Sequence, residues 1–187
     1  KEYRRQRQMC IRDRGDIKSR FFEDTNAASA TYVAAAATPA TTFTLANSSF
    51  GTNTGRKITA TTSGTGDGGK TVTIVGTDVN GDAATEVITL PGSATTTAGT
   101  TTFFQTITSA TVSAQPAANV SLGMADDVAG SIFAGRTRVR QMQVSSGGTA
   151  GNVEVRDAST AGTTGITVRT TDLSLIHISE PTRPLYI

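Results

Sequence analysis

Short stretches in which apolar and polar residues alternate recur along the chain, and glycine-rich segments separate them. The clearest example is residues 71–90, where two runs rich in valine, isoleucine and threonine flank Asn80 and Gly81. Alternation with a period of two indicates a β-strand that buries one face. Asn-Gly between two such runs is a strong hairpin signal, because both central residues of a type I′ turn need a positive φ. Residues 71–90 are therefore predicted to form a β-hairpin with a two-residue turn.

The predicted turn also sets the register of this hairpin. Counting outwards from the turn pairs Thr77 with Ala84 and Ile74 with Val87. Residues that lie directly opposite each other in an antiparallel pair share a face of the sheet. We therefore expect the aliphatic side chains of Ile74 and Val87 to share a face.

Further strands are predicted on both sides of the hairpin, at residues 56–61, 101–112 and 120–124. Regular short strands separated by Gly-rich turns are typical of a β-sandwich or a barrel. The expected fold class is all-β, with an antiparallel β-sandwich or jelly-roll-like domain over residues 41–125. Residues 15–40 are expected to be a linker or leading segment, because their Ala/Thr-rich part lacks an amphipathic helical period.

The strand predicted at residues 101–112 is expected to alternate strictly. One face then carries Phe104, Thr106, Thr108 and Ala110. The other face carries Phe103, Gln105, Ile107 and Ser109.

A second β unit is predicted after residues 125–130. Residues 136–144, 152–157 and 165–170 have the composition of strands and are separated by glycine-rich turns. A stable β domain usually needs more strands than these. We therefore expect residues 130–172 to be a second β domain that is truncated.

The two ends of the chain are related at the level of DNA. Residues 9–14 can be encoded by ATGTGTATAAGAGACAG plus one base, and residues 173–178 by CTGTCTCTTATACACAT plus one base. These two strings are reverse complements. Both strings resemble the transposon end used to fragment DNA for sequencing libraries, and natural termini have no reason to encode both strands of one tag. Foreign segments must be excluded before a fold is inferred. We therefore expect residues 1–14 and 173–187 to be adapter-derived artefacts.

Excluding these ends reverses the sign of the net charge. Seven of the 17 basic residues and three of the 15 acidic residues lie outside residues 15–172, which leaves ten and twelve and changes the net charge from +2 to −2. An Arg-rich run such as residues 4–14 would otherwise suggest a nucleic-acid-binding arm or a solvated charged tail. Without that run there is no global attraction to nucleic acid or to anionic lipid. Nucleic acid is therefore not an expected partner, and neither is a membrane, because no apolar run approaches the roughly 18 residues of a membrane helix.

The only cysteine and the only histidine, Cys10 and His177, also lie in the expected artefacts. Their exclusion removes the common zinc sites, Cys/His nucleophile pairs, Ser-His-Asp triads and disulfide frameworks. A carboxylate-based hydrolase stays open, but its acids must face each other across a few ångströms and line a pocket, which no sequence pattern indicates here. We expect a protein that is not an enzyme and has no cofactor. The carboxylates of that open alternative are Asp67, Asp78, Glu86 and Asp157.

Two acidic clusters could supply oxygen ligands to a metal ion. Asp78, Asn80 and Asp82 have the spacing that opens a calcium loop, but the twelfth position holds threonine instead of the bidentate glutamate. The hairpin turn explains the same three residues. Asp126 and Asp127 lie between two predicted strands, where an acidic pair is more often a solvated loop. No metal site is therefore expected.

Arg136, Arg138 and Arg140 project from one face of a predicted strand, because side chains of a strand alternate with a period of two. This basic stripe could contact a capsid lattice, a glycan carboxylate or nucleic acid, since arginine is favoured at interfaces. The alternative is a solvated sheet face. The three arginines are the candidate interaction site of the sequence.

Several segments resemble a group of largely uncharacterised tailed-phage structural proteins. They are residues 55–59, 73–81, 104–109, 135–140 and 155–157. The resemblance implies a virion component, such as a capsid decoration, fibre or tail accessory protein, and it carries no catalytic residues. It further implies other virion proteins as partners, a homo-oligomer, and a location in the virion and in the host cytoplasm during assembly.

Residues 76–86, GTDVNGDAATE, also resemble Ig-like repeats of bacterial surface proteins. This resemblance leaves a second function open, a secreted Ig-like adhesin or a carbohydrate-binding module. A glycan site needs an exposed aromatic platform, and the absence of tryptophan disfavours it.

Overall fold

The computed structural model describes residues 19–24, 26–132, 138–139, 142, 151–157, 166–173 and 185–186. The secondary structure of these residues is all β, and every strand pair is antiparallel, so the predicted fold class is confirmed. The strands are β1 (Ser29–Ala37), β2 (Gly55–Thr62), β3 (Thr71–Asp78), β4 (Ala83–Thr89), β5 (Thr97–Gly99), β6 (Phe104–Val112), β7 (Val120–Ala129), β8 (Arg138–Val139), β9 (Gly151–Asp157), β10 (Ile166–Leu173) and β11 (Leu185–Tyr186).

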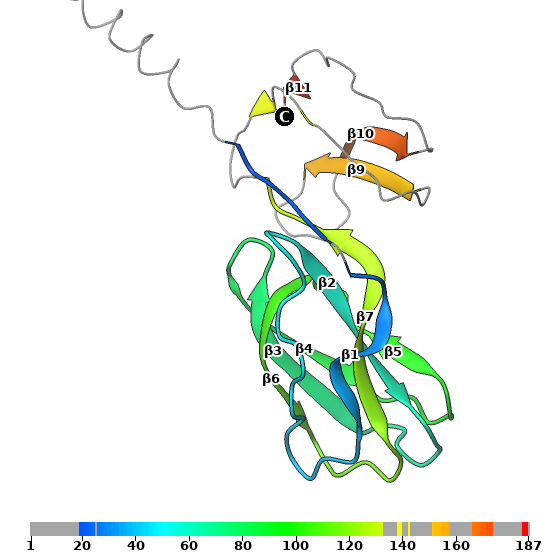
Figure 1. Ribbon diagram of the computed structural model, residues 1–187. Coiled ribbons are helices and arrows are strands. Elements are labelled where there is room, and N and C mark those ends of the chain that lie inside the picture. The colour runs from blue at the N-terminus through cyan, green and yellow to red at the C-terminus, as the bar shows by residue number, and fades with distance from the viewer. Residues whose placement is uncertain are drawn as a thin grey trace, which may run out of the picture.

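Seven strands form one sheet that folds over on itself. Their order is β1-β7-β2-β6-β3-β4, and β5 pairs with β2 beside this path. The connection between β2 and β6 is the single pair Arg56 and Phe104, whereas β2 pairs with β7 along most of its length. On either side of this corner the strands separate into two layers, β1-β7-β2-β5 and β4-β3-β6, which lie against each other (Figure 1). The result is a β-sandwich-like domain.

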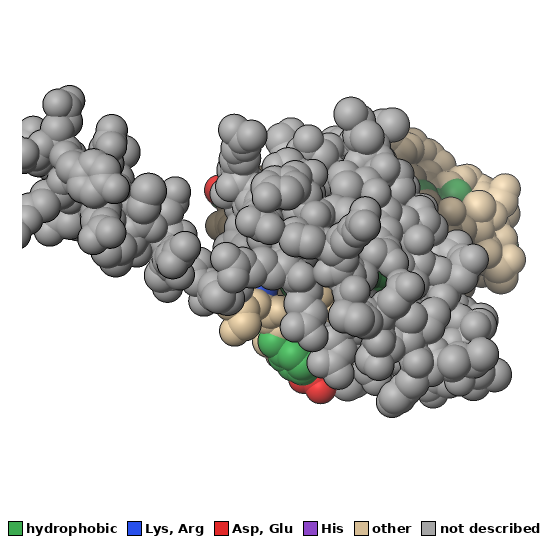
Figure 2. Space-filling view, turned by 90° about the horizontal axis from the view of Figure 1, so that it is seen from above, with side chains coloured by type: hydrophobic (Ala, Val, Ile, Leu, Met, Phe, Trp, Pro, Cys, Tyr) green, Lys and Arg blue, Asp and Glu red, His purple; other side chains and the backbone are tan. Residues whose placement is uncertain are grey.

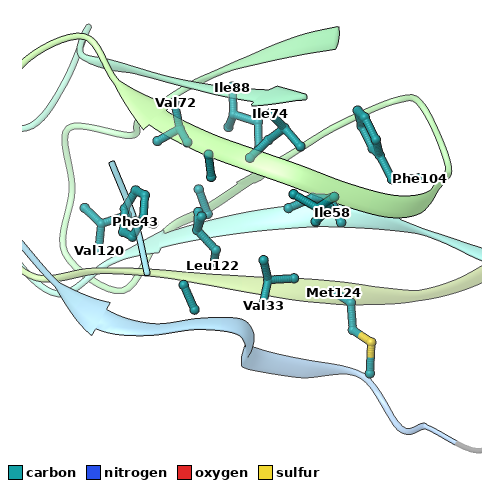
Figure 3. Packing of buried hydrophobic residues seen from close by; sticks show 14 of the residues in the cluster. Val33, Phe43, Ile58, Val72, Ile74, Ile88, Phe104, Val120, Leu122 and Met124 are labelled. Carbon is teal, nitrogen blue, oxygen red and sulfur yellow. The ribbon is translucent and has the colours of Figure 1, made fainter. Parts of the chain in front are cut away.

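Apolar side chains from both layers fill the space between them. In β3, Val72 and Ile74 alternate with half-buried threonines, as expected for a strand with one buried face. Figure 3 shows Val72 and Ile74 on one side of the interior and Val33, Val120 and Leu122 on the other. Each of these five side chains is completely buried, and burial of such a side chain contributes about 1.5–3 kcal/mol. This shared core holds the layers together.

The segment between β1 and β2 closes one side of the sandwich. The N–H of Phe43 donates to the carbonyl of Ala110 in β6 (2.9 Å), and the N–H of Ala46 donates to the carbonyl of Val33 in β1 (2.8 Å). Phe43 and Phe50 are buried in the core. Residues 41–50 therefore cover the outer edges of both β6 and β1.

The β3–β4 hairpin forms where the sequence predicts it, but its turn is different. The N–H of Gly81 donates to the carbonyl of Asp78 (3.0 Å), and the N–H of Asp78 donates to the carbonyl of Asp82 (2.9 Å). Gly81 has a φ of +87°, whereas Asn80 does not have a positive φ. This is a type I turn followed by a left-handed glycine, the usual three-residue hairpin loop. The predicted two-residue type I′ turn is wrong.

The additional loop residue shifts the hairpin register by one position. Ile74 pairs with Glu86, and the predicted pair of Ile74 with Val87 is wrong. A slip of one residue exchanges the two faces of a strand. Ile88 is accordingly 2% exposed, while Val87 is 55% exposed.

β6 does not alternate strictly, contrary to the prediction. Its pairing with β3 contains two register shifts, which insert Gln105 and Thr108 as additional residues. Such β-bulges change the direction of the side chains that follow. Phe104, Ile107 and Ala110 all face the core as a result, although the strict pattern placed Ile107 opposite Phe104.

Gly76 is the residue of β3 against which the bulged backbone of β6 packs. A Cβ at this position would overlap the carbonyl oxygen of Thr106. Because overpacking of a rigid site costs about 1–3 kcal/mol, we expect Gly76→Ala to lower the free energy of unfolding by about 2 kcal/mol in urea titrations. Gly92→Ala is the control, since its Cβ would lie 3.5 Å from the nearest atom, Gly68 Cα. Equal losses for both variants would contradict the packing account.

The remaining strands form two separate pairs. β9 pairs with β10, and β8 pairs with β11. The expected artefact at residues 1–14 lies outside the described residues, while Leu173 ends β10 and the residues of β11 belong to the expected artefact at residues 173–187. β1 lies within the expected leading segment, and its Val33 and Ala34 join the core. Among the residues that the structure describes, a helix with the length and apolarity to cross a membrane is absent.

Candidate interaction surface

Three of the four carboxylates that the sequence singled out as candidate acids are described, and each binds a different part of the backbone. Asp67, Asp78 and Glu86 each accept hydrogen bonds from backbone N–H groups near them. Within the described ranges, no three His, Cys, Asp or Glu side chains come together in a group that could hold a metal ion. For Asp157 the structure describes the backbone in β9 and not the side chain. Asp67, Asp78 and Glu86 therefore hold parts of the backbone in place.

Asp67 joins two loops at one end of the sandwich. It belongs to the loop that connects β2 to β3, and its side chain is completely buried. Oδ1 accepts hydrogen bonds from Lys70 Nζ (2.9 Å) and the N–H of Ala117 (2.6 Å), and Oδ2 accepts one from the N–H of Ala118 (3.1 Å). Burial raises the pKa of Asp67, but these hydrogen bonds outweigh burial and hold the pKa below its ordinary value of 3.8. The charged carboxylate ties the β2–β3 loop to the β6–β7 loop.

Glu86 closes the side of the sandwich opposite residues 41–50. It lies half-buried on the inner face of β4, beside Ile88 in the alternation. Oε1 accepts the N–H of Thr101 (2.7 Å), and Oε2 accepts the N–H of Thr102 (2.8 Å). Burial raises the pKa of Glu86, but the hydrogen bonds from both threonines outweigh burial and hold the pKa below its ordinary value of 4.5. The carboxylate thereby holds β4 against the β5–β6 connection.

Asp78 directs the hairpin turn. Its Oδ1 accepts the N–H groups of Asn80 (2.8 Å) and Asp82 (3.0 Å), and its Oδ2 accepts Asn80 Nδ2 (3.2 Å). A side chain that accepts backbone N–H groups two residues ahead stabilises a turn. The three residues with calcium-loop spacing thus build the turn, as the sequence analysis preferred.

Arg56 is a buried charged residue that the sequence analysis did not single out. It is 3% exposed, and Nη1 donates to the carbonyls of Ala125 and Asp126 at 2.8 Å each. Nη2 donates to the carbonyl of Asn26 and forms an ion pair with Asp24, whereas Nε is buried with no hydrogen-bond partner among the described residues. Arg56 therefore fastens the segment before β1 to the end of β7.

A signal for this burial was present in the sequence. Arg56 has the same strand parity as Ile58 and Ala60, which are both buried. Side chains of equal parity share a face of a strand, so Arg56 has to point inward.

The outer face of the β4-β3-β6 layer carries no charged side chain. Thr77 of β3 pairs with Ala83 of β4 on one side and with Thr106 of β6 on the other. The residues that share a face with Thr77 in these three strands make up the outer face, and the bulged positions of β6 are left out. We call it the Thr/Val face, and it consists of Thr71, Thr73, Val75, Thr77, Ala83, Thr85, Val87, Thr89, Thr106, Ser109 and Thr111.

The Thr/Val face has the chemistry of a contact surface. Its hydroxyl groups can donate and accept hydrogen bonds, as Thr77 Oγ1 and Thr106 Oγ1 do across the strands at 2.6 Å. Covering this face would bury no charge, and burial of an unpaired charge is the main polar cost of association. The centres of protein interfaces are likewise depleted of charged residues.

The outer face of the other layer is different. Lys57 of β2 forms an ion pair with Asp127 of β7 (2.9 Å), and its Nζ lies 4.9 Å from the centre of the Phe103 ring. In the view from above in Figure 2, acidic side chains also reach the surface of the described residues. The absence of charge is therefore a property of the Thr/Val face and not of the whole sandwich.

The arginine stripe predicted from the sequence cannot be compared with this surface. Arg136 and Arg140 lie outside the described residues. Only the backbone of Arg138 is described, in β8, where it pairs with Tyr186. The stripe stays a prediction.

Comparison with known proteins assigns no family to this sandwich. No protein-family model, no curated protein and no solved structure matches the chain.

Proposed function

We propose that the protein is a structural and interaction component of a bacteriophage virion, such as a capsid decoration, fibre or tail accessory protein, without a catalytic role. The Thr/Val face is the observation that carries this proposal. A broad, uncharged sheet face can be covered by a partner without burying a charge. The resemblance of the sequence to tailed-phage structural proteins supplies the class of partner.

In this proposal the protein docks on other virion proteins of the capsid or the tail, and it passes through the host cytoplasm during assembly. It works by covering and joining surfaces, with no cofactor and no nucleic acid. The described carboxylates fit this role, because Asp67 and Glu86 hold loops of the sandwich in place.

The alternative is a secreted Ig-like adhesin or carbohydrate-binding module, which would have a similar sandwich. A glycan site would need aromatic rings on an exposed platform. Among the described residues, the exposed large hydrophobic side chains are Phe21, Val87 and Val128. Phe21 is the one aromatic residue of the three, and it precedes β1. This distribution favours a protein partner over a glycan.

A binding experiment with particles tests the proposal. Purified full-length chain is added to particles of the phage that encodes it, from which the protein has been removed, and co-sedimentation measures rebinding. We expect Thr111→Lys, on the Thr/Val face in β6, to weaken rebinding by about tenfold, because the lysine would be buried without a partner. Thr59→Lys on the outer face of β2 is the matched control, since both threonines are half-buried on strands.

The outcomes distinguish the virion role from the choice of the Thr/Val face as the docking surface. Failure of the unchanged chain to rebind would contradict the virion role, and equal weakening by the two lysines would contradict docking through the Thr/Val face. Genes next to this one give an independent test. Capsid, portal or tail genes are expected there, whereas genes for secretion or sugar uptake would support the adhesin.

A further inference from the structure

The two layers of the sandwich have four edges, and β4 differs from the other three. Residues 41–50 cover the edges of β6 and β1, and β5 is only three residues long. β4 is seven residues long and pairs with β3 on one side. No described strand pairs with its other side.

The backbone groups that point to this open edge follow from the hydrogen bonds of the hairpin. The N–H of Asp78 donates to the carbonyl of Asp82, and the N–H of Leu90 donates to the carbonyl of Lys70. Hydrogen-bonded pairs alternate with non-bonded pairs along an antiparallel ladder, so the even-numbered residues of β4 face β3. The N–H and C=O groups at the open edge belong to Ala83, Thr85, Val87 and Thr89.

Most of the features that usually block a sheet edge are missing from β4. Proteins protect edges with lysine, proline, bulges, or a charge that points inward. β4 contains no lysine or proline, and its pairing with β3 has no register shift. Glu86 points inward, but its carboxylate is already bound to the N–H groups of Thr101 and Thr102. An added strand would therefore meet no free charge.

We propose that β4 pairs antiparallel with β4 of a second copy of this chain across a two-fold axis. The β4-β3-β6 layers of the two copies would then form one continuous sheet. An interface of this kind is made of the same surface twice, so the strand has to be complementary to itself. The Thr/Val face fulfils this condition, because two copies that meet at β4 bring no like charges together on that side.

The hydrogen-bonding pattern restricts the register of this pair. Residues whose backbone N–H and C=O groups point to the open edge have to lie opposite residues of the same kind, so the axis passes through a residue and not between two. Near the middle of β4 that residue is Thr85, Glu86 or Val87. Glu86 on the axis would place two carboxylates opposite each other, which destabilises a strand pair. Val87 on the axis brings together two side chains that are each 55% exposed in the single chain. We assign Val87 to the axis, with Thr85 of one copy opposite Thr89 of the other.

The oligomeric state of the full chain tests this pairing. Analytical ultracentrifugation of the unchanged chain over a range of concentrations is expected to show a monomer–dimer equilibrium. Val87→Lys is expected to raise the dissociation constant by at least about tenfold, because it places two like charges opposite each other. Val128→Lys is the matched control, since Val128 is the other exposed valine among the described side chains, 44% exposed and on β7. A monomer at every concentration, or equal effects of the two lysines, would overturn the proposal.

Disulfide cross-linking tests the register in a Cys10→Ser background. Val87→Cys is expected to form a disulfide-linked dimer on oxidation, because Cα atoms of a directly opposed pair lie about 5.5 Å apart, within disulfide range. Thr85→Cys is expected to cross-link far more slowly, and faster cross-linking at Thr85 would overturn the assigned axis. The pairing does not depend on the virion role. Thr111→Lys, which tests docking on particles, lies two strands away from β4 and is expected to leave the dimer intact.

Discussion

Arg56→Ala is expected to lower the free energy of unfolding by about 3–5 kcal/mol, because it removes one partner of a buried ion pair and leaves the other partner in place. The substitution leaves Asp24, which is 11% exposed, without its counter-charge. It also removes the donor to the carbonyls of Ala125 and Asp126. Urea denaturation followed by circular dichroism measures the loss, and hydrogen exchange is expected to show weaker protection in residues 23–28 than elsewhere.

The neighbouring residue provides the control for this prediction. Lys57 pairs with Asp127, but the two side chains are 30% and 65% exposed. Exposed pairs contribute about 0–1 kcal/mol, so Lys57→Ala is expected to have a much smaller effect. If Arg56→Ala cost no more than Lys57→Ala, the role of Arg56 as a fastening between the segment before β1 and the end of β7 would be wrong.

Asp67→Asn is expected to cost about 2–3 kcal/mol at pH 7, because an amide cannot replace a buried carboxylate that accepts from three donors. The Asn side chain has one acceptor oxygen, so its NH₂ group would face either an N–H donor or the lysine ammonium. Thermal and urea unfolding both report the loss. Asp82→Asn is the control, since Asp82 is an exposed acid in the hairpin turn.

The same variant is expected to change the acid dependence of stability. The pKa of Asp67 is lowered in the folded protein, so the carboxylate contributes its full stabilisation above the ordinary value of 3.8. That stabilisation is lost as the pH falls from there through the folded pKa. Glu86 has the same sign, below its ordinary value of 4.5. Urea unfolding between pH 7 and pH 2 is therefore expected to show a flatter profile for Asp67→Asn, and an unchanged profile would contradict the lowered pKa.

Local sequence patterns were sufficient to predict the fold class but not the details of pairing. Asn80 and Gly81 correctly marked the hairpin between β3 and β4. The register depends on one further contact, the carboxylate of Asp78 that accepts the N–H of Asn80 and favours a type I turn. That contact belongs to the folded turn and is not visible in an Asn-Gly pair alone. The pairing of Ile74 with Val87 was predicted wrongly for this reason.

The bulges of β6 illustrate a second limit. Phe104, Ile107 and Ala110 are three residues apart, which no strict strand period produces. All three can point into the core because Gly76 of β3 lies at one of the register shifts between β3 and β6, where the backbone of β6 approaches closely. A bulge therefore depends on a residue that is about thirty positions away in the chain.

The candidate surface could be predicted only in part. Once β3 and β4 are recognised as strands, parity places Thr73 and Val75 on one outer face. Assigning Val87 to the same face requires the correct register, which the sequence analysis did not have. The buried position of Arg56 could have been inferred from the parity of Ile58 and Ala60 alone.

The pairing of β1 with β7 has a consequence for biosynthesis. β1, the first strand of the sandwich, pairs with β7, the last one, and Ser29 lies opposite Met124. While a ribosome is still making the intervening chain, β1 and one edge of β2 have nothing to pair with. Proteins whose contacts span such long stretches fold slowly, on a scale of about milliseconds to seconds. The nascent chain is therefore most prone to aggregation just before β7 leaves the exit tunnel, and folding is completed only after translation has passed Ala129.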